Sequence, residues 1–192
     1  MITNRFLKLT FSGVAFLRGG ILICFPQLGS FGSLEEHGFA RNRLWVIDSC
    51  LSPLPATNNV STVDLILTPT EEDLKMWSRS FELRLRVSLG PGKLTLIPRV
   101  RNVDTKPFCF TFPLHTYLSV SGISEVRVEG LETLDYFDNL HQKERFSEQA
   151  DAIIFDDEVD RVYLSTPTKI AVIDHEKKRT FELRKEGLPD AD

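Results

Sequence analysis

The chain has 192 residues, which is enough for one β-rich domain with a hydrophobic core and too few to argue for two. Hydrophobic residues make up 42% and charged residues 26%, as in ordinary soluble globular proteins. The net charge of −4 gives no reason to expect nucleic-acid binding. Phe is abundant, with 14 residues, and together with Val, Ile and Thr it favours strands over helices.

The first 17 residues loosely resemble a signal peptide. Arg5 and Lys8 precede a moderately apolar run that ends at Leu17. Polar residues dilute this run, and Arg18 interrupts it before the next apolar stretch, Ile21–Phe25. A charge in the middle of such a stretch argues against a membrane span. We therefore expect a soluble protein that does not associate with membranes.

The three cysteines, Cys24, Cys50 and Cys109, are odd in number and widely spaced. This pattern favours neither a disulfide framework nor a zinc site. It predicts a reducing compartment and a cytoplasmic protein without a bound metal.

Two segments before the middle of the chain contain no strand pattern. Ser49–Ser61, with two prolines and two asparagines, is expected to be a surface loop. Glu71 to Trp77, after Pro69-Thr70, is the one stretch with helical character.

The clearest periodic pattern runs from Ser80 to Leu89. Apolar residues alternate there with charged or polar ones, which is typical of a half-buried strand. Gly90-Pro91-Gly92 predicts a turn into a second strand that starts near Leu94, and hence an antiparallel hairpin. Eight other short segments also have strand character: Val63–Leu67, Phe108–Phe112, His115–Val120, Glu125–Val128, Ala152–Phe155, Val159–Leu164, Lys169–Ile173 and Thr180–Arg184. Many short strands with little helix predict an all-β fold, an antiparallel sandwich or barrel.

Two motifs in the N-terminal third could bind an anion. Arg18-Gly19-Gly20 combines a guanidinium with a flexible backbone, although a surface arginine before a turn is the simpler interpretation. In the second motif His37 stands four residues before Arg41 and next to Gly38. This pair could bind a polar anionic ligand, but spacing alone does not establish it.

Two motifs in the C-terminal half could contribute acid–base or hydroxyl-binding groups. His115 follows an apolar, Phe-rich segment, where its pKa could shift and make it a proton donor; a core histidine bonded to a backbone carbonyl is an equal alternative. Asp160 opens a strand and could accept hydrogen bonds from sugar hydroxyls, or it could be a simple surface acid. No Ser-His-Asp order, nucleotide-binding glycine loop or metal-ligand spacing is found in the sequence.

Taken in order, the four motifs resemble the glucose-6-phosphate 1-epimerases of the aldose 1-epimerase superfamily, and most of all the plant members called apospory-associated protein C-like. The resemblance extends from about Arg18 to Asp190. Besides the motifs it rests on Cys24-Phe25-Pro26-Gln27, on Gly122–Asp138 and on Ile173–Thr180. Each motif alone is weak, whereas the ordered set is specific.

The resemblance implies a galactose-mutarotase-like antiparallel β-supersandwich that interconverts the α and β anomers of a hexose 6-phosphate without a cofactor. It implies that His115 is the general acid that protonates the ring oxygen. It further implies that His37 and Asp160 hold the ring oxygen and hydroxyls, and that Arg18 and Arg41 clamp the phosphate. General acid–base catalysis of ring opening and arginine recognition of a phosphate fit these roles.

The sequence also departs from this family. The family's general base is a glutamate in a later segment, and no residue of this chain matches it. Residues 1–17 do not resemble the opening strands of relatives. We therefore expect residues 1–17 to be a divergent segment and residues 18–192 to form a partial domain, an incomplete sandwich with little or no mutarotase activity. If the chain is active, Glu144, Glu148 and Asp157 are the first substitutes for the glutamate to consider.

Three functions remain at this stage. The first is a hexose-6-phosphate mutarotase, a monomer with glucose 6-phosphate as its substrate. The second is a catalytically silent protein that binds a sugar phosphate. The third, a mutarotase for unphosphorylated sugars, is disfavoured because a neutral sugar offers Arg18 and Arg41 no charge to neutralise.

Overall fold

The computed structural model describes residues 7–11, 19–30, 32–49 and 59–188, with only the backbone for residues 7–11. The chain divides into two compact units. The first contains Ile23–Pro113, and the second contains Leu114–Asp192 together with Ile2–Leu22. Each unit is described here by itself.

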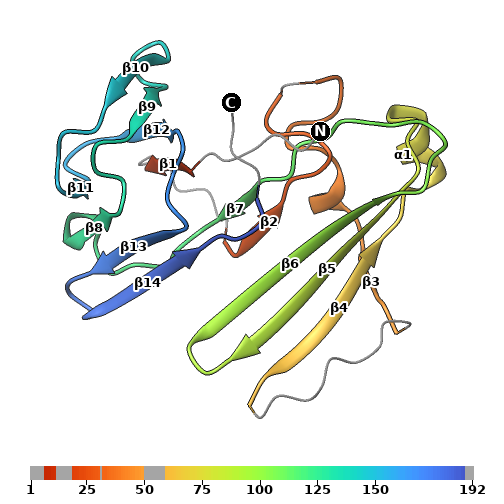
Figure 1. Ribbon diagram of the computed structural model, residues 1–192, viewed down its shortest axis with the longest axis horizontal. Helices are drawn as coiled ribbons and strands as arrows, with labels where there is room; N and C mark the ends of the chain where they lie inside the picture. Colours follow the sequence, from red (N-terminus) through yellow and green to blue (C-terminus); the bar gives the residue numbers. More distant parts are fainter. Residues whose placement is uncertain (1–6, 12–18, 31, 50–58, 189–192) are drawn as a thin grey trace. The chain divides into compact units, whose positions relative to one another are not determined.

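The first unit is built on one antiparallel sheet with the strand order β3-β4-β5-β6 (Figure 1). Its strands are β3 (Val46–Ile47), β4 (Ser61–Leu67), β5 (Phe81–Gly90) and β6 (Lys93–Asn102). The predicted hairpin is confirmed, since β5 pairs with β6 along its whole length and Gly92 in the turn has φ +64°. The alternation is confirmed as well, because Phe81, Leu83 and Leu85 are buried.

The single helix α1 (Glu71–Met76) precedes β5 and confirms the predicted helix. It begins at a capping box: the Thr70 hydroxyl accepts from the Asp73 N–H, and the Asp73 carboxylate accepts from the Thr70 N–H. This reciprocal pair satisfies two backbone donors that would otherwise lack partners, which explains why so short a helix forms at this position.

Aromatic rings form the core of the first unit. The Phe25 ring is fully buried and lies 4.9 Å from the Phe81 ring, 5.3 Å from Phe110 and 5.8 Å from Trp77, centroid to centroid. The predicted strand Phe108–Phe112 is wrong: only an isolated bridge at Phe110 is strand-like. Its phenylalanines instead pack against this core, so burial, not sheet pairing, accounts for the apolar run.

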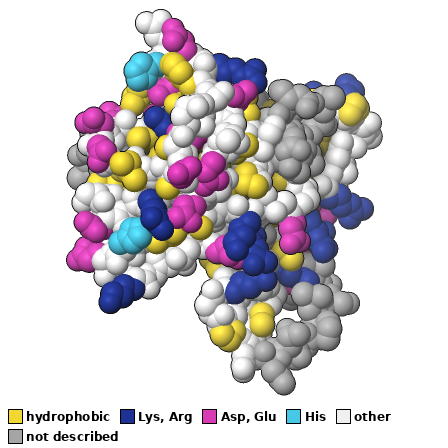
Figure 2. All heavy atoms as spheres, turned by 60° about the vertical axis from the view of Figure 1, so that its left-hand side comes forward, with side chains coloured by type: hydrophobic (Ala, Val, Ile, Leu, Met, Phe, Trp, Pro, Cys, Tyr) yellow, Lys and Arg dark blue, Asp and Glu magenta, His cyan; other side chains and the backbone are white. Residues whose placement is uncertain are grey.

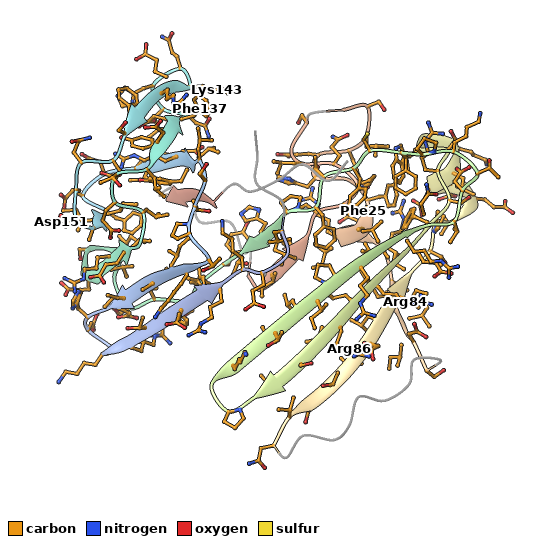
Figure 3. All side chains as sticks on the ribbon, viewed as in Figure 1. Phe25, Arg84, Arg86, Phe137, Lys143 and Asp151 are labelled. Atoms are coloured by element: carbon orange, nitrogen blue, oxygen red, sulfur yellow. The ribbon has the colours of Figure 1, made fainter. Side chains whose placement is uncertain are left out.

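The arginines of β5 pair with carboxylates on β4, just after β3 and on β5 itself. Arg86 forms two hydrogen bonds with Asp64, at 2.6 and 2.9 Å, which lower the pKa of the Asp64 carboxyl. Arg84 donates to Asp48 at 2.8 Å and to Glu82 at 2.9 Å. Figure 3 shows Arg84 and Arg86 on this sheet. These arginines therefore support the sheet and are not candidate ligand-binding residues.

The second unit contains two four-stranded antiparallel sheets, ordered β1-β12-β9-β10 and β11-β8-β13-β14, and β7 of a two-stranded pair with β2 (Figure 1). The strands are β1 (Leu7–Phe11), β2 (Ile21–Ile23), β7 (Leu114–Thr116), β8 (Val126–Glu129), β9 (Asp135–Asp138), β10 (Glu144–Ser147), β11 (Ile153–Ile154), β12 (Val159–Tyr163), β13 (Lys169–Asp174) and β14 (Arg179–Arg184). Two 3-10 helices complete the described elements, η1 (Ala40–Asn42) in the first unit and η2 (Ile123–Glu125) in the second. The predicted all-β, antiparallel fold class is confirmed.

Most predicted strands of the second unit exist, with three corrections. Residues 117–120 are not a strand; Leu118 and Val120 pack as irregular chain against the core. The segment Ala152–Phe155 shortens to the two residues of β11, and Glu125 ends η2 instead of opening β8. The core consists of buried residues from both sheets: Val126, Val128, Leu131, Tyr136, Ile153, Tyr163, Ile170 and Val172.

The Asp174 carboxylate, fully buried at the end of β13, links two segments of the second unit. It accepts hydrogen bonds from the Ser121 hydroxyl at 2.6 Å, from the Ser121 and Lys177 amides at 3.1 Å, and from Arg179 Nε at 3.3 Å. The Ser121 hydroxyl contributes most, and these donors together lower the pKa of Asp174 to about 2 from its ordinary 3.8.

The depressed pKa of Asp174 predicts acid sensitivity of the second unit. Because the ionised form is favoured in the folded state, the stabilisation is complete above about pH 4 and is lost as the pH falls through about 2. We expect Asp174→Asn to lower the stability at pH 6 and to flatten its dependence on pH between 4 and 2. Urea unfolding across this range measures the effect, with the exposed Asp151→Asn as the control. A parallel pH dependence in the Asp174→Asn chain would contradict the assignment.

A second stability prediction comes from the turn before β9, where the exposed Thr133 has φ +62°. A β-branched residue in the left-handed region is strained by about 1–2 kcal/mol. Replacing it with glycine removes this strain but adds about 0.4–1 kcal/mol of unfolded-state entropy. We expect Thr133→Gly to stabilise the chain by about 0.5–1 kcal/mol in urea unfolding. Thr180→Gly, on the exposed face of β14, is the control and should destabilise; a loss of stability in both variants would refute the strain argument.

The surface of the second unit carries charges of both signs. Ion pairs join adjacent strands, such as Arg145 to Asp135 and Lys169 to Glu182, and Figure 2 shows basic and acidic side chains interspersed on the face turned forward. Exposed pairs of this kind contribute little to stability. None of the helices in the described part of the chain has the length and apolar character needed to span a membrane.

Candidate functional site

The loop from Gln27 to η1 presents two of the predicted site residues in the first unit. It leaves the buried Phe25 and returns to it, because the Ala40 N–H donates to the Phe25 carbonyl at 3.2 Å. The next carbonyl, of Pro26, accepts from the Thr111 N–H at 2.9 Å. Both ends of the loop are thus attached to the aromatic core.

Gly38 makes this return possible. A Cβ at this position would lie 2.3 Å from the Phe25 carbonyl oxygen, and the residue has φ +69°. Any side chain would collide with the backbone, so only glycine allows the chain to pass so close to Phe25. Both the positive φ and the close approach therefore require glycine at this position.

His37 is held in one orientation by two hydrogen bonds to Gly29. The backbone N–H of His37 donates to the Gly29 carbonyl at 2.9 Å, and the ring atom Nδ1 of His37 accepts from the Gly29 N–H at 3.0 Å. A neutral imidazole that accepts at Nδ1 carries its proton on Nε2. The Nε2 atom lies 3.7 Å from the Glu36 carboxylate, and 16% of the side chain is exposed. His37 can therefore offer an N–H donor at the surface of the loop.

Arg41 lies on η1, on the same loop as His37. Its Nη2 donates to the Glu36 carbonyl at 2.8 Å, which orients the guanidinium. Its Nε is buried and has no hydrogen-bond partner among the described residues. Such a donor is costly unless a ligand accepts from it, and an oxyanion is the best acceptor for a guanidinium.

The neighbouring Arg43 has a structural role. Its guanidinium donates to Asp73 Oδ1 at 3.0 and 2.6 Å and so connects the end of η1 to α1. Burial opposes the ionisation of Asp73, but hydrogen bonds from Arg43 and Thr70 outweigh it and lower the pKa of Asp73. The two arginines are therefore distinguished by their partners, which the sequence does not reveal.

The other two described candidates, His115 and Asp160, belong to the second unit. His115, on β7, is half-buried and stacks on Tyr117 with 4.7 Å between ring centroids. Asp160, on β12, accepts from the Asn139 side chain at 2.8 Å and also from the Asn139 N–H through its backbone carbonyl. Tyr117 and Asn139 were not predicted as site residues. Tyr117 follows the end of β7 and Asn139 follows β9, so no strand periodicity pointed to either side chain.

Three other predicted residues, Arg18, Glu144 and Asp157, lie outside the described residues or on the surface. Arg18 lies outside the described residues, while the adjacent Gly19 and Gly20 are exposed. Glu144 and Asp157 are exposed, in β10 and in a turn. The convergence of His37, Arg41, His115 and Asp160 on one pocket stays a prediction.

Glu148 is committed to a buried network. It accepts from the Tyr163 hydroxyl at 2.7 Å, from Arg161 at 3.0 Å and from the backbone N–H groups of Gln149 and Ala150 at 3.1 Å. Burial, and then the hydrogen bond with Glu148, raise the pKa of Tyr163. These donors occupy both oxygens of Glu148, so the network fastens the loop after β10 to β12. Within the described residues, no group of three His, Cys, Asp or Glu side chains could hold a metal ion.

Comparison with solved structures shows which fold class the chain belongs to. A "putative mutarotase (YeaD)" from Salmonella typhimurium superimposes with a TM-score of 0.74 at 28% identity, over 90% of this chain and 56% of that one. A "galactose mutarotase related enzyme" from Lactobacillus acidophilus superimposes with a TM-score of 0.66 over 84% of this chain and 61% of that one, and at 17% identity it bears on the fold alone. The chain has a galactose-mutarotase-like β fold.

The family follows from the sequence comparisons. The model of the aldose 1-epimerase family matches residues 12–191. A protein of Cenchrus ciliaris, "putative glucose-6-phosphate 1-epimerase", is 62% identical over 188 residues, which are 96% of this chain and 57% of that protein. This chain belongs to the aldose 1-epimerase family, and it spans about half the length of the curated relatives it matches.

Proposed function

We propose that the protein is a hexose-6-phosphate mutarotase that interconverts the anomers of glucose 6-phosphate. The observation that carries this proposal is the buried Arg41 Nε, which has no partner among the described residues, on the same loop as a histidine held with its ring proton on Nε2. These groups suit a ligand with both an oxyanion and a hydroxyl or ring oxygen. The 62% identity to a protein named for glucose-6-phosphate epimerisation supports the choice of sugar.

In this proposal His115 is the general acid. Ring opening requires a proton at the ring oxygen while the anomeric hydroxyl loses one. His37 and Asp160 hold the ring oxygen and the hydroxyls, and Asn139 fixes the Asp160 carboxylate through its hydrogen bond at 2.8 Å. Arg18 and Arg41 bind the phosphate. No cofactor takes part, and the protein acts as a monomer in the cytoplasm.

A second candidate function is binding of a sugar phosphate without turnover. The observation behind it is that Glu148, the buried one of the candidate substitute bases, is already occupied by four donors. The two functions share the phosphate clamp and differ only in proton transfer. Measuring both binding and anomer exchange therefore separates them.

The phosphate clamp predicts that Arg41→Ala weakens binding of glucose 6-phosphate. A charge-assisted hydrogen bond contributes about 1.5–3 kcal/mol, which corresponds to about a 10- to 150-fold loss of affinity. Isothermal titration calorimetry with glucose 6-phosphate and with glucose measures it, with the exposed Arg99→Ala as the matched control. Equal affinity of the unchanged chain for the two sugars would contradict the phosphate clamp.

The role of His115 predicts that His115→Ala slows anomer exchange by about 100-fold or more, since a general acid typically contributes 10²–10⁴-fold. Exchange between the anomers of glucose 6-phosphate can be followed by NMR exchange spectroscopy, with the exposed His175→Ala as the control. An unchanged rate in His115→Ala would exclude it as the acid. Calorimetric binding with exchange at only the spontaneous rate would instead favour the second candidate.

A further inference from the structure

Gln27, which lies outside the predicted set of site residues, has a buried polar side chain in the loop that presents His37. Only 7% of Gln27 is exposed. Its Nε2 donates to the carbonyl of Gly29 at 2.9 Å and lies 3.3 and 3.5 Å from the carbonyls of Leu34 and Glu35. Its Oε1 accepts from the Leu34 N–H at 3.3 Å. One side-chain amide thus ties the two sides of the loop together.

Next to this amide the loop has a glycine, Gly32, where a side chain would compete with it for space. At Gly32 a Cβ would lie 2.2 Å from Gln27 Oε1, so a side chain there would displace the amide. The backbone of the preceding residue, Pro26, is attached to Thr111 next to the aromatic core. The backbone before Gln27 is thus held by Thr111, and the side-chain amide of Gln27 is held by the loop.

Gly29 connects Gln27 to His37. The Gly29 carbonyl accepts from both Gln27 Nε2 and the His37 N–H, and the Gly29 N–H donates to His37 Nδ1. The Gly29 carbonyl and N–H belong to the two peptide groups on either side of its Cα, so Gln27 acts on this N–H through the backbone of Gly29. The placement of the N–H decides whether Nδ1 can accept, and with it which nitrogen of His37 carries the proton. Among the described residues, the other donor to the Gly29 carbonyl is the His37 backbone N–H.

We propose that Gln27 is a positioning residue: through Gly29 it holds His37 in the tautomer with the proton on Nε2. That Gln27 affects substrate binding rests on the proposed function, in which His37 donates from Nε2 to a sugar oxygen. That Gln27 sets the tautomer of His37 does not depend on the proposed function. The tautomer and substrate binding can therefore be tested separately.

The test uses Gln27→Met, which keeps the length of the side chain and removes the amide, with Gln149→Met as the matched control. The Gln149 amide donates to the Ser147 carbonyl at an exposed position of the second unit. Histidine nitrogen shifts in long-range ¹H–¹⁵N spectra report the tautomer, and a His37→Asn spectrum identifies the His37 signals among the four histidines.

In Gln27→Met, the fraction of His37 protonated at Nδ1 should rise about fivefold, the ratio set by one lost hydrogen bond. The scalar coupling between the Gly29 amide nitrogen and His37 Nδ1 should weaken. Affinity for glucose 6-phosphate should fall in proportion to the fraction of His37 that loses its Nε2 proton. The Gln149→Met chain should match the unchanged chain in all three measurements. A merely structural role would lower the melting temperature but leave the tautomer unchanged, and that result would overturn the proposal.

Two further outcomes are decisive. If Gln27→Met shifts the tautomer but the unchanged chain does not bind glucose 6-phosphate, the positioning role stands and the proposed function fails. If Gln27→Met does not fold, the proposal is tested by two measurements on the unchanged chain. Slow exchange of the Gln27 side-chain amide protons together with the Gly29–His37 coupling supports the proposal, and either fast exchange or a missing coupling overturns it.

Discussion

The contact between the Gly38 backbone and the Phe25 carbonyl determines the geometry of the loop in the first unit. Phe25 is fully buried among aromatic rings, so its carbonyl has a fixed position. The chain returns to that carbonyl through the Ala40 N–H, and it can do so only because residue 38 has no side chain. His37 immediately precedes this contact and Arg41 immediately follows it. The hydrophobic core thus sets the two ends of the loop that carries these two polar residues.

The buried polar side chains differ in whether their hydrogen-bonding capacity is used. Asp174 and Glu148 each accept several hydrogen bonds from groups of their own unit and serve as structural links. Among the predicted site residues, Arg41 has a buried Nε without a partner in the described part of the chain; Thr111 Oγ1 and Arg127 Nε share this property elsewhere. Because an unsatisfied buried donor is expensive, the Arg41 Nε supports the proposal that a ligand oxyanion binds there. The proposal for phosphate binding follows from this contrast, and the family relationship suggests which phosphate.

Evolutionary relationship and local geometry contribute separate parts of the functional argument. Membership of the aldose 1-epimerase family rests on the match over residues 12–191. It does not say how an individual side chain is oriented, and the Gln27–Gly29–His37 connection shows the kind of information that it leaves out. A sequence motif identifies His37 as a candidate site residue, and the hydrogen bonds to Gly29 decide which of its ring nitrogens can donate.

The sequence by itself determined those features that arise from local periodicity or local capping. The alternation in Ser80–Leu89 predicted β5 and its buried face, because neighbours along the chain supply this pattern. The stretch from Glu71 to Trp77 after Pro69-Thr70 predicted α1, whose capping box between Thr70 and Asp73 is equally local. The sequence did not indicate β9 or β10. The four residues of β9 carry two aromatic rings between two aspartates and pair with the later strand β12, and the four residues of β10 are all exposed, so neither segment has a strong period. The sequence also failed for Phe108–Phe112, where packing replaced pairing. Only the tertiary structure decided that Arg43 is occupied by Asp73, that Glu148 is occupied by Tyr163 and Arg161, and that Gln27 reaches Gly29, since the folded backbone alone brings these partners within hydrogen-bonding distance.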